Sequence, residues 1–255
     1  MKTCSAIVSA TMLAAVSSAS AAIVASDNGS NYGSGWTNGS NGGTGFGAWS
    51  FATQGGGYKG AFVGNPSNIG VTGMGSSALA LYANGGGNAG IWALRSFNNA
   101  LGVGDSFSLQ WGINWDSGTT GQKSIILYTG SGFSTYALQV SNQGSASISV
   151  LAATSGPVSD IGFGYGTDAM TWTFTQTTAT SVTVTANDRD GSGSYSQTFA
   201  VNGALSGFGL FAGAFSDSNG NREPYYNNFT INAVPAPGAL ALLGVAGLVG
   251  ARRRR

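Results

Sequence analysis

The chain has 255 residues, of which only 7% are charged and 43 are glycine, and it contains no histidine and a single cysteine. Aromatic residues make up 11% of it, which is too many for a disordered glycine-rich segment. Between residues 23 and 233, five basic residues stand against nine acidic ones, and this net charge of −4 argues against nucleic-acid binding.

The N-terminus has the layout of a secretory signal peptide. Lys2 is followed by an apolar stretch and then by small residues at positions 19–21 that suit signal peptidase. Cleavage is expected next to Ala22, so we assign residues 1–22 to the signal and expect a helix there. Cys4 would leave with this segment, and the mature chain would then have no thiol or disulfide. A buried N-terminal helix is the alternative.

Residues 23–233 are expected to form one β domain, which begins with a glycine- and asparagine-rich stretch over residues 23–74. Apolar and polar residues alternate with a period of two, which indicates strands with one buried face. The clearest inward-facing sets are Phe107, Leu109, Trp111, Ile113 and Trp115; Tyr136, Leu138 and Val140; Ile148 and Val150; Met170, Trp172 and Phe174; and Val182 and Val184.

Further strands are expected at residues 76–83, 90–97, 123–130, 194–201, 207–215 and 225–233, with glycine-, asparagine- and aspartate-rich turns between them. A chain with about ten to twelve antiparallel strands predicts an all-β fold of two packed sheets, an antiparallel jelly-roll sandwich. A right-handed β-helix is the alternative fold, but the sequence lacks a regular repeat.

The segments FSLQWGINW, KSIILYTG and YALQVS, followed by GFGLFAGAF and YYNNFTI, resemble the strand order of concanavalin-A-like lectin and glucanase sandwiches. The resemblance covers residues 75–233. The last strand of that family often carries an Asn- or Asp-Asn-Phe element, which here is Asn227, Asn228 and Phe229. The resemblance implies a jelly-roll fold that either binds glycans or hydrolyses them.

Glycoside hydrolysis needs two carboxylates that flank the scissile bond. The only glutamate is Glu223, beside Pro224, so the glutamate-rich motif of the jelly-roll glucanases is missing. Nearly all aspartates lie at turn signals, where Asp binds backbone amides for structural reasons. Without histidine or a mature cysteine the usual catalytic triads are also excluded. We therefore expect no catalysis, with a divergent glycoside hydrolase as the alternative.

Five aromatic residues are candidates for a glycan-stacking platform: Trp36, Trp49, Trp92, Tyr225 and Tyr226. They lie among glycine and asparagine residues, and small-molecule sites combine aromatic rings with a few polar groups. The alternative is that these rings fill the core, as we expect for Trp111 and Trp172 on their alternating strands.

Two turns are candidate calcium loops, with oxygen ligands at alternating positions: Asp188 and Asp190, and Asp217, Asn219 and Asn221. Neither completes an EF-hand, because the twelfth position counted from Asp217 is Asn228 rather than Glu. Ordinary hairpin turns are the alternative, and no other cofactor is expected.

A threonine ladder follows one pair of strands, with Thr171, Thr173 and Thr175 opposite Thr183 and Thr185. Such ladders occur in ice-binding proteins, which need a flat and repeated face. Two strands are too few for such a face, and threonine suits the solvent side of any sheet. The ladder is therefore expected to be ordinary sheet surface.

Residues 234–255 form a separate tail with Pro235 and Pro237, a small apolar run expected to be helical, and four terminal arginines, Arg252, Arg253, Arg254 and Arg255. This layout resembles the PEP-CTERM sorting signal of bacterial surface proteins, which a membrane enzyme called exosortase recognises. One position departs from the pattern, because Ala236 replaces the usual glutamate between the prolines. A retained membrane anchor is the alternative, since the apolar run is short for a bilayer span but carries cytoplasmic-type arginines.

These features predict a protein of the bacterial surface or of its extracellular matrix, exported by the Sec machinery and sorted by exosortase. The expected role is structural or glycan-binding, with polysaccharide as the partner. No nucleic acid is expected as a partner, and the membrane is expected to be contacted through the C-terminal helix before processing.

Overall fold

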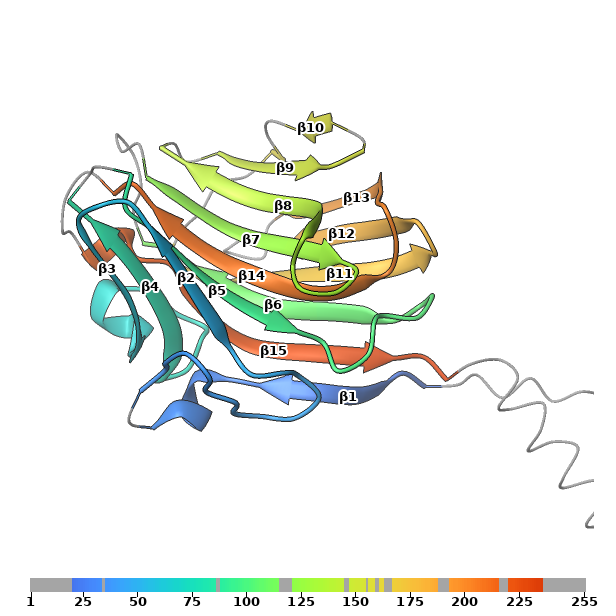
Figure 1. Cartoon of the computed structure of the whole chain (residues 1–255), viewed down its shortest axis with the longest axis horizontal. Coiled ribbons are helices and arrows are strands. Elements are labelled where there is room, and N and C mark those ends of the chain that lie inside the picture. The colour runs from blue at the N-terminus through green and yellow to red at the C-terminus, as the bar shows by residue number, and fades with distance from the viewer. Residues whose placement is uncertain are drawn as a thin grey trace, which may run out of the picture. The chain divides into compact units, whose positions relative to one another are not determined.

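The strands of the computed structural model pair into two antiparallel sheets that pack face to face (Figure 1). Both sheets belong to the unit of residues 21–234. The structure describes residues 20–33, 35–85, 88–114, 121–144, 147–154, 156–158, 161–162, 167–187, 193–215 and 220–235. The predicted signal helix and C-terminal helix lie outside these residues. Within them, no helix is long and apolar enough to cross a bilayer.

One sheet has eight strands, in the order β13 (Ser194–Ala200), β12 (Ser181–Asn187), β11 (Met170–Thr178), β6 (Ser106–Gly112), β15 (Tyr225–Ala233), β4 (Ala78–Asn84) and β3 (Tyr58–Gly64), with β1 (Ala22–Asp27) paired to β15. The other has seven, in the order β10 (Gly156–Val158), β9 (Ile148–Ala152), β8 (Thr135–Gln143), β7 (Gln122–Thr129), β14 (Leu205–Gly213), β5 (Gly90–Ser96) and β2 (Ser50–Gln54). Three short 3-10 helices, η1 (Gly29–Tyr32), η2 (Pro66–Ile69) and η3 (Gly220–Arg222), lie in the connections.

The core lies between the sheets and is built from the alternating apolar residues. Phe107 and Trp111 of β6 face the same way as Trp172 of β11, and all three are completely buried. Leu138 and Val140 of β8 meet them from the opposite sheet. Burial of these side chains is the main driving force for folding. The predicted all-β antiparallel sandwich is confirmed, and the alternative β-helix is wrong because the named strands pair antiparallel.

The glycine- and asparagine-rich stretch belongs to the sandwich, as expected, but it contributes strands that its sequence did not indicate. It supplies β1, β2 and β3, so the described chain has fifteen strands rather than the predicted ten to twelve. The polarity of β1 hides it in the sequence, because Ile23 is 66% exposed while Asp27 on the same strand is 2% exposed. A buried aspartate inverts the pattern from which strands are predicted.

Asp27 is buried because it pairs with Arg95 of β5, whose guanidinium Nη1 donates to the Asp27 carboxylate. Arg95 also donates to the carbonyl oxygens of Gly47 and Gly42, each at 2.7 Å. The Tyr32 hydroxyl donates to Asp27 as well, and burial raises the pKa of Tyr32 to about 12. A buried charge needs such partners. The cluster therefore ties the glycine-rich stretch to β5 of the seven-stranded sheet.

A β-bulge places one predicted core residue on the surface. Leu127 pairs with Leu138, but the next residue, Tyr128, pairs with Tyr136, so Ala137 is an extra residue in β8. Such a bulge turns the flanking side chains to the opposite face. The prediction of Tyr136 in the core is therefore wrong: it lies on the outer face beside Tyr128, where its hydroxyl donates to the Leu151 carbonyl oxygen at 2.7 Å.

Candidate functional site

The outer face of the eight-stranded sheet is a hydroxyl surface. One row of paired residues crosses six strands: Ser196, Thr185, Thr173, Ser108, Thr230 and Ser26. The hydroxyl oxygens of Ser108 and Thr230 lie 2.7 Å apart. The predicted threonines lie opposite one another on β11 and β12, and serine and threonine residues continue the row over four further strands. Threonine is common on the solvent side of a sheet, so the row is explained as sheet surface.

The outer face of the seven-stranded sheet is different, because aromatic side chains gather on it. Trp92 of β5 is paired with Phe211 of β14, and their ring centroids lie 4.6 Å apart at 35°. Tyr128 of β7 and Tyr136 of β8 lie on the same face, with Leu94 between the two groups. We call these five residues, Trp92, Leu94, Tyr128, Tyr136 and Phe211, the aromatic face. Trp92, Tyr128 and Tyr136 are only half-buried, so their rings are open to a ligand.

Glycines of β14 give the aromatic face its low profile. Gly209 lies between Leu94 and Ile126 in the neighbouring strands. A Cβ atom at Gly209 would lie 2.8 Å from Cδ2 of Leu94 and 3.2 Å from the Tyr128 ring. At Gly213 it would overlap the Phe211 ring. Glycine at these positions therefore allows the neighbouring side chains to lie flat across β14.

A cluster of neutral hydrogen-bonding groups borders the aromatic face. The Ser124 hydroxyl accepts from Nε2 of Gln139 at 2.7 Å and of Gln122 at 3.2 Å, and it donates to the Ser141 hydroxyl at 3.2 Å. Gln122 also donates to Ser141 at 3.1 Å. Both glutamines use their amide nitrogens in these bonds, so their amide oxygens are the acceptors that a ligand hydroxyl would meet.

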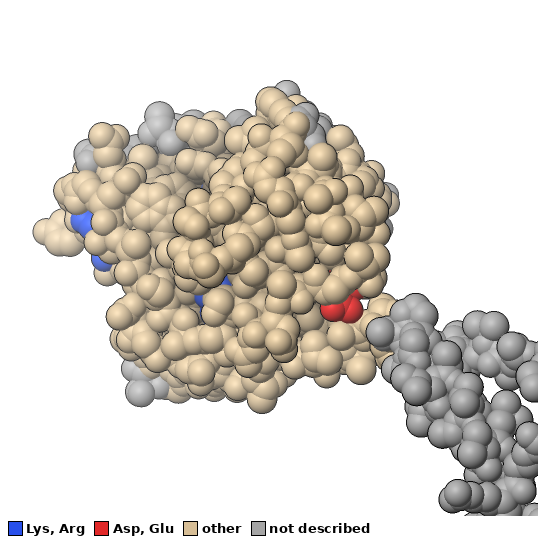
Figure 2. Space-filling model, turned by 45° about the vertical axis from the view of Figure 1, so that its right-hand side comes forward, with Lys and Arg blue, Asp and Glu red and all other residues tan. Residues whose placement is uncertain are grey.

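A hollow of about 160 Å³ lies beside this cluster, and we call it the glutamine hollow. Its lining includes Gln54, Gln122 and Gln143 around the Phe211 ring, with Asn88 at its rim. None of the lining residues that the structure describes is charged. Figure 2 likewise shows a face of the molecule that carries very few charged side chains. Rings beside neutral amides and hydroxyls suit a neutral, hydroxyl-rich ligand.

Four of the five aromatic residues predicted as a platform are buried instead. Trp49 is 1% exposed, packs on Phe208 at 5.5 Å between centroids, and donates from Nε1 to the Tyr32 hydroxyl at 2.7 Å. Trp36, at 2% exposure, lies against Trp49 at 5.0 Å. A ring without exposed surface cannot stack on a sugar. The prediction of an open platform is therefore wrong for Trp36 and Trp49, because the glycine-rich stretch folds into the sandwich.

The two predicted tyrosines are also buried. Tyr226 is completely buried in the main core, stacked at 7° on Trp111 with 6.3 Å between centroids. Tyr225 points to the other side of β15, where it is 4% exposed and packs with Val71 and Met74. The prediction is wrong for Tyr225 and Tyr226 as well, since neighbouring residues of one strand face opposite ways and both faces are covered here. Trp92 alone among the five lies on an open face.

Most of the other predicted site residues lie outside the described part of the chain. This applies to Asp188, Asp190, Asp217 and Asn219, and to Pro237 and Arg252–Arg255 of the tail. The backbone of Asn221 is in η3, but its side chain is not described. Among the described residues, no group of three or more acidic, histidine or cysteine side chains could hold a metal. The calcium loops stay a prediction.

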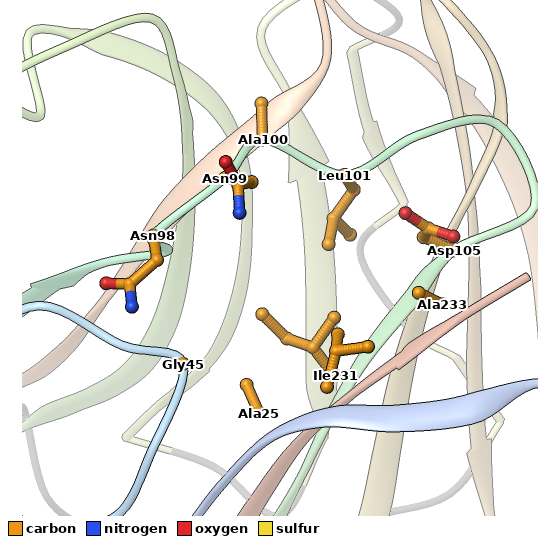
Figure 3. A pocket seen from close by; sticks show the side chains of 10 residues that line it. Ala25, Gly45, Asn98, Asn99, Ala100, Leu101, Asp105, Ile231 and Ala233 are labelled. Carbon is orange, nitrogen blue, oxygen red and sulfur yellow. The ribbon is translucent and has the colours of Figure 1, made fainter.

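A second hollow, of about 310 Å³, lies beside the beginning of β1 and the end of β15 (Figure 3). Leu101 points across it toward Ile231, and Asn98 and Asn99 lie at its rim (Figure 3). Its charged residue is Asp105, whose carboxylate accepts from the backbone amides of Gly102 and Val234, each at 2.8 Å. Asp105 is thus a backbone cap, as predicted for the turn aspartates. The residues lining this hollow include no aromatic ring, so it fits a sugar less well than the aromatic face.

The described carboxylates have structural partners or stand alone, whereas a glycosidase needs two that flank the scissile bond. Asp27 is paired with Arg95, Asp105 binds backbone amides, and Asp168 accepts from the Thr72 hydroxyl. Burial raises the pKa of the Glu223 carboxyl to about 7. A raised pKa suits a general acid, but such an acid works with a second carboxylate across the bond. Glu223 therefore does not by itself make a catalytic site.

Sequence reasoning missed Phe211, Gln122 and Gln139. The segment GFGLFAGAF contains a usable signal, because Gly207, Gly209, Phe211 and Gly213 alternate with core residues. Three glycines on the solvent side of one strand leave a single ring standing there. The pairing of that ring with Trp92 depends on strand order, which joins residues 119 positions apart in the sequence.

No protein-family model matches the chain, and no curated protein resembles it in sequence closely enough to count as a relative. Among solved structures, the VIP36 exoplasmic/lumenal domain in its Ca²⁺- and Man3GlcNAc-bound form has a TM-score of 0.44 and 8% identity, over 74% of this chain and 84% of that one. The T. cruzi calreticulin globular domain has a TM-score of 0.46 and 12% identity, over 76% and 87%.

The CBM2 module of the Lactobacillus casei BL23 phage J-1 evolved Dit protein has a TM-score of 0.46 and 11% identity, over 73% of this chain and 90% of that one. Each of these matches has a TM-score below 0.5 and is at most 12% identical to this chain. At this level of identity and TM-score, the likeness concerns architecture and identifies no ligand.

Proposed function

We propose that this protein binds an uncharged glycan on the aromatic face and catalyses no reaction. The observation that carries the proposal is the half-buried Trp92 ring, which packs on the largely buried Phe211 beside the partly exposed amides of Gln122 and Gln139. The buried Ser124 hydroxyl accepts from both amides and so holds them in place. Aromatic rings cover the apolar faces of a sugar, and neutral amides and hydroxyls bind its hydroxyl groups. The lack of charged lining residues in the glutamine hollow favours a neutral ligand over a uronate or a sulfated sugar.

Binding is tested with the full chain on an array of uncharged glycans that includes cellulose-, chitin- and mannan-derived oligosaccharides. Trp92→Ala is expected to lower the affinity about 30-fold, the loss typical of a central aromatic contact worth about 2 kcal/mol. Tyr58→Ala is the matched control, because Tyr58 is an aromatic residue of the other sheet that is 80% exposed. Trp92→Phe keeps a ring on Phe211 and should restore part of the affinity.

Two results would overturn this proposal. One is unchanged glycan binding after Trp92→Ala in a folded protein. The other is the absence of wild-type binding to every glycan, which would leave a structural role in the matrix as the function. Thermal unfolding of each variant establishes that it is folded before binding is compared.

The absence of catalysis is part of the same proposal. It is supported by the structural bonds of Asp27, Asp105 and Asp168 and by the single glutamate of the chain. Incubation of the protein with each bound polysaccharide should release no reducing ends above a buffer control. Release that disappears in Glu223→Gln would instead establish the alternative, a divergent glycoside hydrolase.

We further propose export by the Sec machinery and sorting of the tail by exosortase to the bacterial surface. The position of β1 supports cleavage of the signal, because β1 begins at Ala22 and cleavage before that residue would leave the sheet whole. Mass spectrometry of the protein from its host is expected to find an N-terminus at Ala22 or Ile23 and a chain that lacks Arg252–Arg255. An intact arginine end in the mature protein would favour the retained membrane anchor.

A further inference from the structure

A third hollow lies at the far end of β14 from the glutamine hollow. It measures about 380 Å³, and its lining includes Ser96, Ser131 and Ser206 together with the Phe133 ring, so we call it the serine hollow. Ser206 and Phe211 mark the two ends along β14. A strand advances about 3.4 Å per residue, so the five steps between them cover about 17 Å. This distance is several times the length of a single sugar ring.

Between the two hollows, β14 itself contributes little side-chain bulk to the outer face of the sheet. Gly207 and Gly209 face outward there, and β14 raises no side chain on this path before Phe211. A Cβ atom at Gly207 would lie 3.0 Å from Cε1 of Phe133. A Cβ atom at Gly209 would likewise contact the side chains of Leu94 and Tyr128. Side chains of the neighbouring strands and loop therefore cover β14 between the two hollows, and a ligand that reached both would lie on Leu94, Tyr128 and Phe133.

Each end of this path presents an aromatic ring. The Trp92–Phe211 pair stands at the glutamine hollow, and Phe133 stands at the serine hollow, held edge-on to Tyr128 with 5.5 Å between centroids. Phe133 has φ +57°, a conformation that a bulky residue rarely adopts. The loop keeps a phenylalanine at a position that favours glycine, and the result is a ring placed over the end of β14.

Unusual backbone conformations mark both ends of the path. Four non-glycine residues of the described chain have a positive φ, and three of them border the two hollows: Asn88 and Ala214 at the glutamine hollow and Phe133 at the serine hollow. Residues in such conformations gather at binding sites, where the surrounding structure maintains them. The two hollows thus share a feature that the rest of the described surface shows only at Asn228.

From this geometry we infer that the ligand is an extended, uncharged oligosaccharide chain that lies along β14 and is bound at both ends, by Trp92 and by Phe133. The inference rests on the proposed glycan binding and adds the ligand's length and direction. No described lining residue of either hollow is charged, which agrees with a neutral chain. The ends of such a chain would extend past both hollows, so the site would recognise the interior of a polysaccharide.

The test measures affinity against chain length. Cello-, chito- and manno-oligosaccharides of one to six units are titrated into the full chain by isothermal calorimetry. The affinity for one series is expected to rise at least tenfold from the monosaccharide to the tetrasaccharide and then to level off. Phe133→Gly should lower the affinity for the hexasaccharide about tenfold and leave the affinity for the monosaccharide unchanged. Trp92→Ala should lower both affinities.

Phe133→Gly is chosen because glycine adopts a positive φ without strain, so the variant keeps its fold while it loses the ring. The melting temperature of Phe133→Gly should fall, relative to the wild type, by no more than the melting temperature of the surface control Tyr58→Ala does. Equal affinity for the monosaccharide and the hexasaccharide, or a hexasaccharide unaffected by Phe133→Gly, would overturn this inference alone. No binding of any series by the wild type would overturn the proposed function together with it.

Discussion

Removal of Arg95 is expected to destabilise the fold far more than removal of a surface cation. In Arg95→Met the buried Asp27 carboxylate loses its counter-charge, and the carbonyl oxygens of Gly42 and Gly47 lose their donors. Breaking a buried ion pair from one side costs about 3–5 kcal/mol. In a chain of this size 1 kcal/mol shifts the melting temperature by about 2–4 °C, so a fall of about 6–20 °C is expected.

The assay is thermal unfolding together with urea unfolding, which gives the free energy independently. Lys59→Met is the control, since Lys59 binds only carbonyl oxygens of its own turn, the nearest being that of Gly55 at 2.7 Å. It should change stability by no more than about 0.5 kcal/mol. The double variant Asp27→Asn with Arg95→Met should cost less than the sum of the single changes, because each single change leaves the other group buried without its partner.

A fall of less than about 1 kcal/mol in Arg95→Met, or strict additivity in the double variant, would refute this reasoning. Either result would mean that the charges are well solvated in the folded state. The glycine-rich stretch over residues 41–49 would then be attached by its aromatic residues alone, Phe46 and Trp49. Limited proteolysis of that stretch distinguishes the two cases, because it should be cut faster in Arg95→Met than in the wild type.

Three further predictions concern single groups. Tyr136→Phe removes the hydrogen bond to the Leu151 carbonyl oxygen and should lower the free energy of unfolding by about 1 kcal/mol in urea titrations; no change would mean that water replaces the bond. Burial raises the pKa of Glu223 from 4.5 to about 7, so the folded state holds a proton that the unfolded state releases, and stability should fall as pH rises through this range. Glu223→Gln should flatten that slope in melting curves, and an equal slope in both proteins would contradict the shift. If the predicted calcium loops bind, calcium should raise the melting temperature and a chelator should lower it, and Asp188→Asn or Asp217→Asn should reduce the effect.

The fold class was predictable because its evidence is local. Alternation in the segments that became β6, β11 and β12 reports which side of each strand is buried, and it needs no knowledge of the neighbouring strands. The glycine-rich stretch escaped prediction because its strands are short and β1 buries an aspartate. Tyr136 escaped because a bulge depends on the register of two strands, and register is not visible in either strand alone.

The sequence predicted the type of ligand for the candidate site but not most of the residues that form the site. Aromatic residues among neutral polar ones indicated a glycan, and Trp92 was among the candidates. Four of the five candidates are buried, because exposure depends on what covers a residue in the folded chain. Phe211, its ring partner, lies 119 positions away and becomes its neighbour only when β14 pairs with β5.

By itself the sequence determined the all-β class and most core positions, and it supported the expectation of a signal, a sorting tail and a glycan ligand. These follow from composition and from patterns within a few residues, which act through local geometry and burial. Only the tertiary structure decided which aromatic rings face solvent, that Asp27 meets Arg95, and that β14 carries a low path between two hollows. Each of these depends on contacts between strands distant in the sequence, and the physical reason is that burial and pairing are properties of the assembled sheets.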